Sequence, residues 1–377
     1  MRLSSLRLTN FRKFREQRVE FPPGGVAILG DNGQGKTNLL EAIYYLEIFR
    51  SFRGAPDEQL VRFGESVFRV EGRVEGGRPE RVIAAAYDRA RKRKKVAVDG
   101  VEPARIGDAL GQIGVVIFSP SDVEIVSGSP SARRRFLDIL LSLTERGYLD
   151  DLQRYRQILL RRNAVLRNGG GADVVVVWNE GLVRSGSRIV AARLRWIASR
   201  APVFVRRVVE IAGGGDASLE YEPSIPLSGE GEPPEPARIA ELLADELLRV
   251  AERETRLGTT LVGPHRDDLR MRTASGDGEK LADLRLYGSG GQQRTAAVAL
   301  RMVEAETLRD HLQSPPIILL DDVFAELDAA RSNRILQWIA VEETAQVILT
   351  APKPGDFELR QGALPVWRLQ NGVLSTL

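Results

Sequence analysis

The segment Gly30-Asp31-Asn32-Gly33-Gln34-Gly35-Lys36-Thr37 sets the architecture of this 377-residue chain. It fits the pattern GxxxxGK[ST], in which glycines let backbone N–H groups turn inward around phosphates while the lysine adds a positive charge. An apolar strand is expected directly before it, at Val26–Leu29, and a helix directly after it, because apolar positions then recur at helical spacing. We therefore predict that all eight residues bind a nucleotide, with the Thr37 hydroxyl ligating Mg²⁺.

Two segments near the other end of the chain are predicted to complete the nucleotide site with a second anion-binding helix start and with carboxylates. Ser289-Gly290-Gly291-Gln292 opens a predicted helix, and a serine with two glycines at a helix N-terminus forms a second anion site. The apolar run Ile317–Leu320 ends in Asp321-Asp322, as a buried strand does when it delivers carboxylates to its end. We expect Asp321 to hold Mg²⁺, and Asp322, with Lys36, to be catalytic by orienting or deprotonating an attacking water.

The separation of these motifs implies that the two ends of the chain fold together around an insertion. We predict an α/β head from residues 1–121 and 249–377, with a β-rich lobe of hairpins between Ser66 and Val101. Residues 122–248 are expected to form an inserted, mainly helical arm. Glycine and proline breaks predict helices of moderate length there. Apolar heptads are not sustained for long enough to predict a coiled coil. Beyond the arm, Leu261–Pro264 is expected to be strand-like.

Composition excludes several classes of protein. No apolar run approaches the roughly 20 residues that a membrane span needs, and the N-terminus lacks the apolar core of a signal peptide, so we expect a cytoplasmic protein without a membrane partner. There is no cysteine and there are two histidines, which argues against thiolate zinc sites, thiol nucleophiles and histidine-based triads.

Basic residues are clustered even though the net charge is only +3. The clusters are Arg89–Lys95, Arg133–Arg135 and the arginines spread between Arg154 and Arg200. Two interpretations are open: sequence-independent contacts to DNA phosphates, or solvated helix faces whose arginines pair with local acids. For His265, a structural role near Arg266 and Asp267 is favoured over a role in nucleotide binding.

The three motifs, in this order, resemble the ATP-binding-cassette ATPases. Finer segments resemble the bacterial RecF family of recombination mediators over nearly the whole chain. These segments are Leu6–Phe14, Gly33–Ile43, Phe118–Pro120, Gly128–Asp138, Gly263–Leu269, Gly291–Thr295 and Leu320–Asp328.

This resemblance implies an ATP-driven homodimer, in which Ser289, Gly291 and Gln292 of one subunit complete the site around Lys36 of the other. Asp328 would lie at the subunit junction. The dimer would clamp duplex DNA and single-strand/duplex junctions, act with RecR and indirectly with RecA, and serve DNA repair, replication restart and the SOS response. Asp322 stands where cassette transporters have glutamate, and its shorter side chain predicts slow hydrolysis. The resemblance implies that DNA stimulates this hydrolysis.

Two other functions are weighed against this one. The ATPase subunit of a membrane transporter is disfavoured, since transporter cassettes place the loop and the serine-glycine segment closer together and lack a basic helical insert. An ATP-sensing adaptor without catalysis would keep Lys36 but tolerate loss of Asp322.

Overall fold

The computed structural model of the chain describes residues 1–76, 80–169, 172–227, 231–274, 281–323, 328–341, 345–352, 364–370 and 372–376. These residues divide into two compact units. The first combines Met1–Asp122 with Leu300–Leu377, and the second is Val123–Ala299. The two ends of the chain therefore belong to one unit, and the second unit is an insertion within it.

A six-stranded sheet forms the core of the first unit, in the order β14-β13-β3-β12-β11-β7. Its strands are β3 (Gly25–Leu29), β7 (Val115–Phe118), β11 (Ile317–Asp321), β12 (Val347–Ala351), β13 (Val366–Gln370) and β14 (Val373–Thr376). β14 pairs antiparallel with β13, and the other neighbours are parallel. Every residue of β3, β7, β11 and β12 is buried, which explains their continuous apolar sequences. The strands predicted before the loop and before Asp321 are confirmed.

A second, antiparallel sheet forms the predicted β-rich lobe of this unit, in the order β2-β1-β4-β5-β6. Its strands are β1 (Arg2–Phe11), β2 (Phe14–Glu20), β4 (Val67–Glu75), β5 (Arg81–Asp88) and β6 (Arg93–Val98). Along β4, exposed and buried residues alternate, so one face of the sheet packs inward. The hairpins expected between Ser66 and Val101 are confirmed.

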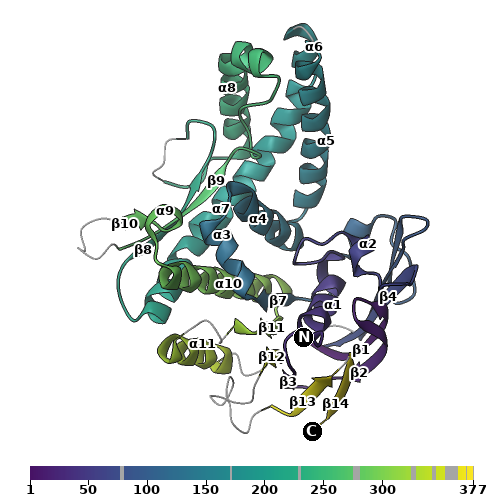
Figure 1. The fold of residues 1–377 in the computed structure, drawn as a ribbon. Coiled ribbons are helices and arrows are strands. Elements are labelled where there is room, and N and C mark those ends of the chain that lie inside the picture. Colours follow the sequence, from purple (N-terminus) through teal and green to yellow (C-terminus); the bar gives the residue numbers. More distant parts are fainter. Residues whose placement is uncertain are drawn as a thin grey trace. The chain divides into compact units, whose positions relative to one another are not determined.

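Helices complete the first unit. They are α1 (Lys36–Ile48), α2 (Asp57–Leu60), the 3-10 turns η1 (Ile106–Ala109) and η2 (Pro120–Asp122), α10 (Gly290–Leu312) and α11 (Ala329–Val341). α1 is buried along almost its whole length and lies against the six-stranded sheet, as Figure 1 shows. The boundary between the two units falls inside α10.

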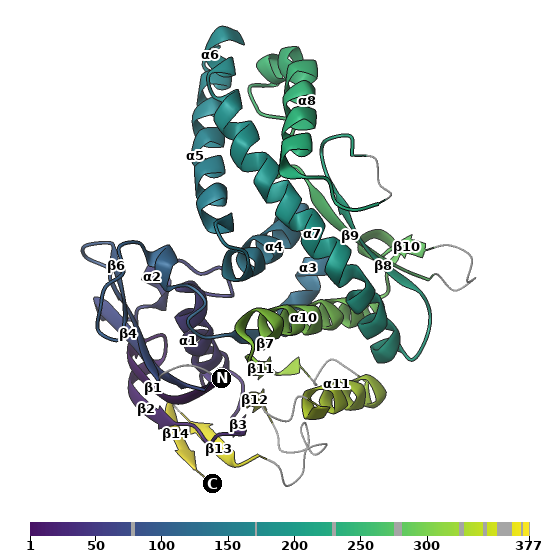
Figure 2. The same cartoon turned by 180° about the vertical axis from the view of Figure 1, so that it is seen from behind.

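The second unit is mainly helical. Its helices are α3 (Val123–Ser127), α4 (Pro130–Thr144), α5 (Tyr148–Arg167), α6 (Ala172–Val176), α7 (Asn179–Ala212), α8 (Pro236–Leu257) and α9 (Leu284–Tyr287). α5 and α8 each pack against α7 (Figures 1 and 2). On α8 the buried residues Ile239, Leu243, Leu247 and Val250 recur every three or four positions, so this helix presents one apolar stripe to its neighbours.

Three details of the second unit correct the sequence-based expectations. α7 is 34 residues long, whereas helices of moderate length are expected, because Pro202 is accommodated inside it. Residues 217–222, predicted to be in the helical arm, form β8 (Ala217–Glu222) of a sheet ordered β10-β9-β8 with β9 (Asp268–Ala274) and β10 (Leu281–Asp283). Leu261–Pro264 is not a strand but a turn-rich segment.

The compact units do not follow the predicted division into head and arm at every point. Residues 249–299, predicted to be in the head, lie in the second unit together with the arm. The predicted domains are functional ones: an ATPase head of residues 1–121 and 249–377, and an arm of residues 122–248. This division stays a prediction. In the described part of the chain, no helix combines the length and the apolar character of a bilayer span.

A buried ion pair links α5 to α8. Arg162 and Glu254 are 1% and 0% exposed, and their side chains meet at 2.7 Å. Arg162 also donates to Asn179 Oδ1 at 3.0 Å and Thr260 Oγ1 at 2.8 Å, so its guanidinium is hydrogen-bonded on three nitrogens. Such a network fixes how α5, α7 and α8 meet, because each polar group has one geometry in which it is satisfied.

Replacing Arg162 by methionine should therefore lower the free energy of unfolding by about 3–5 kcal/mol, since Glu254 is left buried without its counter-charge. The double variant Arg162→Met/Glu254→Met should lose much less than the sum of the two single variants. Urea unfolding of the four proteins measures this cycle, and additive losses would contradict the predicted coupling.

Candidate nucleotide-binding site

The loop between β3 and α1 has the backbone of an anion-binding turn. Gly33 and Gly35 have φ angles of +81° and +110°, which favour glycine because other residues are strained there. Gly35 is the N-cap of α1, and no side chain caps this helix end. The first N–H groups of α1 are thus available to an anion that binds within the loop.

Gly30 is required for a different reason, which is the approach of another strand. A Cβ atom at this position would lie 2.5 Å from the carbonyl oxygen of Leu369 in β13. The edge of the loop is therefore pressed against the C-terminal part of the chain. Asp31, Asn32 and Gly33 are exposed and form the outer rim of the loop, with Gln34 partly exposed.

The Lys36 side chain is 4% exposed and lies under the loop. Its ammonium donates to the carbonyl of Gly30 at 2.6 Å and lies 3.8 Å from Asp322 Oδ2. A buried ammonium needs such partners. From this position beside the loop, the ammonium can bind a phosphate held by the loop.

Thr37 and Asp321 come together although they are 284 residues apart. The Thr37 hydroxyl donates to Asp321 Oδ1 at 3.0 Å, and Asp321 is 5% exposed. Burial raises the pKa of Asp321, hydrogen bonds from Thr37 and Thr350 lower it in part, and the adjacent Asp322 raises it further. A hydroxyl and a buried carboxylate that needs positive charge are the oxygen donors that Mg²⁺ prefers, so these residues fit the predicted metal site.

Asp322 is held in an uncommon conformation at the end of β11. Its φ is +50°, a value that is unusual for a residue other than glycine. Its backbone N–H donates to Thr350 Oγ1 at 3.3 Å, and its carboxylate lies 3.5 Å from the same hydroxyl. The strained backbone turns the carboxylate toward Lys36.

Thr350 is the residue that sequence reasoning missed. The sequence places it at the end of a predicted apolar strand, and that position suggests no role by itself. It lies opposite Asp321 in the parallel ladder, and its hydroxyl also donates to Asp321 Oδ1 at 3.1 Å. One hydroxyl thus contacts both aspartates, since it donates to the Asp321 carboxylate and accepts from the Asp322 backbone N–H. The usable signal is a polar residue at the end of the apolar strand β12.

Ser289–Gln292 begins α10 as predicted, with the capping bonds expected of such a start. The Ser289 N–H donates to Gln292 Oε1 at 2.9 Å, and the Gln292 N–H donates to Ser289 Oγ at 3.3 Å. Ser289 and Gly290 are exposed, and Gly291 is partly exposed. The segment belongs to the second unit up to Ala299, so its role in a nucleotide site stays a prediction.

Asp328 caps α11. Its carboxylate accepts from the Arg331 N–H at 2.9 Å and forms an ion pair with the Arg331 guanidinium at 3.2 Å. The side chain is about half exposed, at 54%. The predicted place of Asp328 at a subunit junction is not tested by these contacts. Phe324–Leu327, which carried part of the family resemblance, lies outside the described residues.

The basic clusters are partly structural. In the first cluster, Arg89 donates to the carbonyls of Glu58 and Val61, and Lys94 pairs with Asp57 at 2.7 Å. In the arm, the arginines that pair with carboxylates close to them in space are Arg156, Arg162, Arg184, Arg188, Arg193 and Arg195. The expectation that several arm arginines pair locally is confirmed, and DNA contact stays a prediction.

His265 has the structural role that the sequence favours. Its ring bonds the Tyr155 hydroxyl at 2.6 Å and the Thr260 carbonyl at 3.2 Å. Burial lowers the pKa of His265 to about 4, with nearby arginines acting in the same direction. The imidazole is therefore neutral at physiological pH.

The contact between the loop and β13 gives a direct test. Gly30→Ala should lower stability by about 1–3 kcal/mol, because the new methyl group overlaps the Leu369 carbonyl and forces the strand away. Gly24→Ala is the matched control, since a Cβ atom there meets nothing within 4 Å. Thermal unfolding of both variants measures the difference, and equal melting temperatures would contradict it.

Comparison with known proteins agrees with this geometry. Residues 2–375 match the family described as the RecF/RecN/SMC N terminal domain. The "DNA replication and repair protein RecF" of Synechococcus sp. (strain JA-3-3Ab) is 37% identical over 364 residues, which is 95% of this chain and 93% of that protein.

Two solved structures extend the comparison to the fold. One is described as the recombination mediator protein RecF with ATP in the RecFOR pathway, and has a TM-score of 0.89 and 33% identity over all of this chain and 97% of that one. The other, an Smc head domain from Pyrococcus furiosus, is 15% identical with a TM-score of 0.57, covers 95% of that chain, and so shares the fold alone. The fold is the predicted α/β head of the cassette type with an inserted helical arm. By sequence and by fold, the chain belongs to the RecF family of DNA replication and repair proteins.

Proposed function

We propose that this protein is an ATP-dependent DNA clamp and recombination mediator, which binds and slowly hydrolyses ATP to control its grip on DNA. The observation that carries the proposal is the convergence of Lys36, Thr37, Asp321 and Asp322 at the carboxyl ends of β3 and β11. The ATP complex of the RecF relative supports the choice of nucleotide.

In this proposal the loop Gly30–Thr37 wraps the phosphates of ATP with its backbone N–H groups. Lys36 exchanges its contacts with the Gly30 carbonyl and Asp322 for the β- and γ-phosphates. Thr37 and Asp321 would hold Mg²⁺, which supplies positive charge that neutralises the phosphate oxygens. Burial and the neighbouring Asp322 both disfavour the charged form of Asp321, so a cation bound here would stabilise its carboxylate.

Asp322 orients the attacking water and accepts its proton. Hydrolysis of a γ-phosphate needs mainly positioning and charge stabilisation from the protein. The Thr350 hydroxyl and the constrained backbone at Asp322 hold the carboxylate in place. Aspartate reaches less far than glutamate, which suits a slow switch better than rapid turnover.

Dimerisation completes the site. The exposed, capped start of α10 offers Ser289, Gly291 and Gln292 to the γ-phosphate bound by another copy of the chain, and Asp328 lies at the junction. The head, residues 1–121 and 249–377, and the arm, residues 122–248, then close together around duplex DNA or a single-strand/duplex junction. RecR is the proposed direct partner, and RecA loading in the cytoplasm is the proposed outcome in repair, replication restart and the SOS response.

Asp322→Asn should keep ATP binding and ATP-dependent DNA binding but lower hydrolysis by about 100-fold or more, because the general base is lost. Lys36→Met should lose nucleotide binding and every effect of ATP. Phosphate release, dimer mass and duplex affinity with and without ATP are measured for each protein. Unchanged turnover in Asp322→Asn would indicate an ATP-sensing adaptor or a different base, and no effect of ATP on wild-type DNA affinity would exclude the clamp.

The shared site is tested by mixing two inactive proteins. Lys36→Met and Ser289→Arg should each be inactive alone, since each blocks both sites of its own homodimer. An equal mixture should recover measurable hydrolysis, up to about a quarter of the wild-type rate if the two chains pair at random, because each mixed dimer has one intact site. A mixture that stays inactive would contradict the composite site.

A further inference from the structure

A basic cavity lies in the second unit, away from the nucleotide loop in the sequence. It has a volume of about 210 Å³ and is lined by α4, α5, α7 and the segment Pro264-His265. Part of the lining comes from two of the segments that resemble the RecF family, Gly128–Asp138 and Gly263–Leu269, to which the proposed ATPase cycle gives no task, and the rest comes from α5 and α7.

Charge is the distinctive property of this cavity. Arg134, Arg135, Arg156 and Arg193 line it, against a single carboxylate, that of Asp138. His265, the remaining titratable base in the wall, is held neutral by burial, which lowers its pKa to about 4. The lining therefore carries a clear excess of positive charge.

Asp138 pairs with both Arg193 and Arg156, so the one carboxylate in the wall is shared between two of the four arginines. It accepts from Arg193 Nη2 and Arg156 Nη2, each at 2.8 Å, and from the Tyr148 hydroxyl at 2.8 Å. Arg134 donates to the backbone carbonyl of Asp267 at 2.8 Å, a neutral partner that fixes the side chain and leaves its charge in place. Arg193 is buried at the floor, whereas Arg135, Arg156 and Ser131 are exposed at the mouth.

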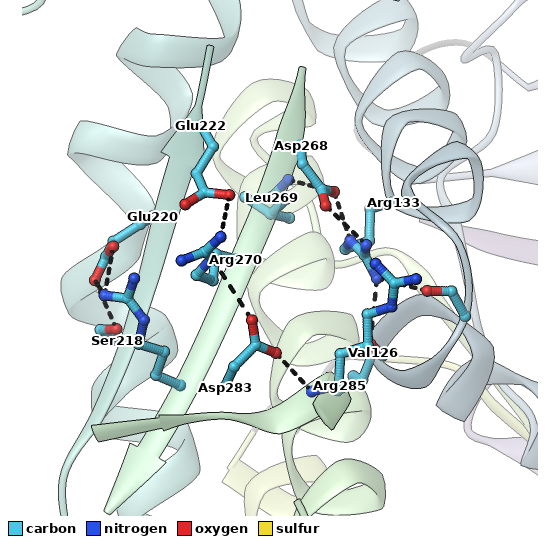
Figure 3. Close-up of polar contacts among 12 residues, drawn as sticks. Val126, Arg133, Ser218, Glu220, Glu222, Asp268, Leu269, Arg270, Asp283 and Arg285 are labelled. Carbon is cyan, nitrogen blue, oxygen red and sulfur yellow. Dashed lines mark hydrogen bonds and ion pairs between the residues drawn. The ribbon is translucent and has the colours of Figure 1, made fainter. Parts of the chain in front are cut away.

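Adjacent arginines in Arg133–Arg135 have different roles. Arg133 is buried and turned away from the cavity, and it forms a two-pronged pair with Asp268 of β9 at 2.7 and 2.9 Å (Figure 3). This pair anchors α4 to β9. Arg134 and Arg135, next along α4, line the cavity, so the anchor holds them in position.

We propose that this cavity is an oxyanion site that takes a phosphate group of the DNA backbone. Guanidinium groups recognise phosphate through paired N–H bonds, and three of the four, those of Arg134, Arg135 and Arg156, line the cavity above the buried Arg193 together with Ser131. A fixed pocket of this kind adds a positioned phosphate contact to the diffuse attraction of other surface arginines. The proposal rests on the DNA binding proposed above and adds a defined site to it.

The two histidines of the chain, His265 and His311, give a local readout of the cavity. His265 lies in its wall, whereas His311 lies on α10 in the first unit. Inorganic phosphate, followed by proton NMR, should shift the His265 ring signals and leave His311 unchanged. A short duplex added with ATP should shift them as well, and Arg134→Gln/Arg135→Gln should abolish both shifts. No shift of His265 with phosphate would overturn the oxyanion site, and a shift with phosphate but not with duplex would overturn its assignment to DNA.

Duplex affinity over a range of salt concentrations provides the second arm. Arg134→Gln/Arg135→Gln should weaken binding about 10-fold or more and reduce the slope of log affinity against log salt by about one. The control Arg154→Gln/Arg238→Gln removes the same charge from exposed positions of the same unit that do not line the cavity. Equal losses in the two double variants would overturn the site in favour of diffuse attraction.

Two further measurements keep the result interpretable. Arg135→Glu reverses one exposed charge at the mouth, so it should lose DNA affinity while thermal unfolding stays cooperative; retained affinity would overturn the proposal. ATP hydrolysis and ATP-dependent dimerisation should be normal in these variants. If the proposed clamp function is wrong, the DNA affinity of the wild type will not depend on ATP. The phosphate titration of His265 then still shows whether the cavity binds an oxyanion.

Discussion

The position of β12 between β3 and β11 is the constraint on which the nucleotide site depends. Thr350 lies opposite Ile28 on one side and Asp321 on the other, so one register aligns the loop strand, the hydroxyl and the carboxylate. Side chains alternate along a strand, and a slip of one residue would turn Thr350 and Asp321 to the wrong faces. Every residue in these strands is buried, so side chains are packed on both faces of the sheet, and a slip would force both packed faces to rearrange.

The nucleotide loop, the strand before it and the strand carrying Asp321 were predictable because each has a strong local signature. Glycines at fixed spacing, a lysine and threonine at a helix start, and an apolar run ending in two aspartates all reflect local physical needs. Thr350 was not predictable, since a lone threonine after apolar residues has no distinctive pattern and its role arises from pairing across the sheet. The length of α7 was also missed, because a proline inside a helix can be tolerated where long-range packing compensates for the missing hydrogen bond.

The high arginine content agreed with a DNA-binding class of protein, but it did not show which arginines are exposed. The sequence alone does not show whether a guanidinium is exposed to solvent or buried. Arg162 is 1% exposed, and three of its nitrogens donate hydrogen bonds. The difference depends on acids far along the chain, such as Glu254 for Arg162 and Asp268 for Arg133. The second unit therefore uses much of its positive charge as internal structure, and its outward charge is concentrated at fewer places than the sequence indicates.

The interleaving of the first unit also has a consequence for biosynthesis. β3 emerges early, yet its neighbours β12 and β13 begin at Val347 and Val366, and the whole second unit is made in between. At ordinary translation rates this delay is on the order of tens of seconds. The second unit is one continuous segment and can fold while the ribosome is still at work. The strand beside the phosphate loop must wait with its edges unpaired, so the core of the first unit is completed only after the second unit has been made.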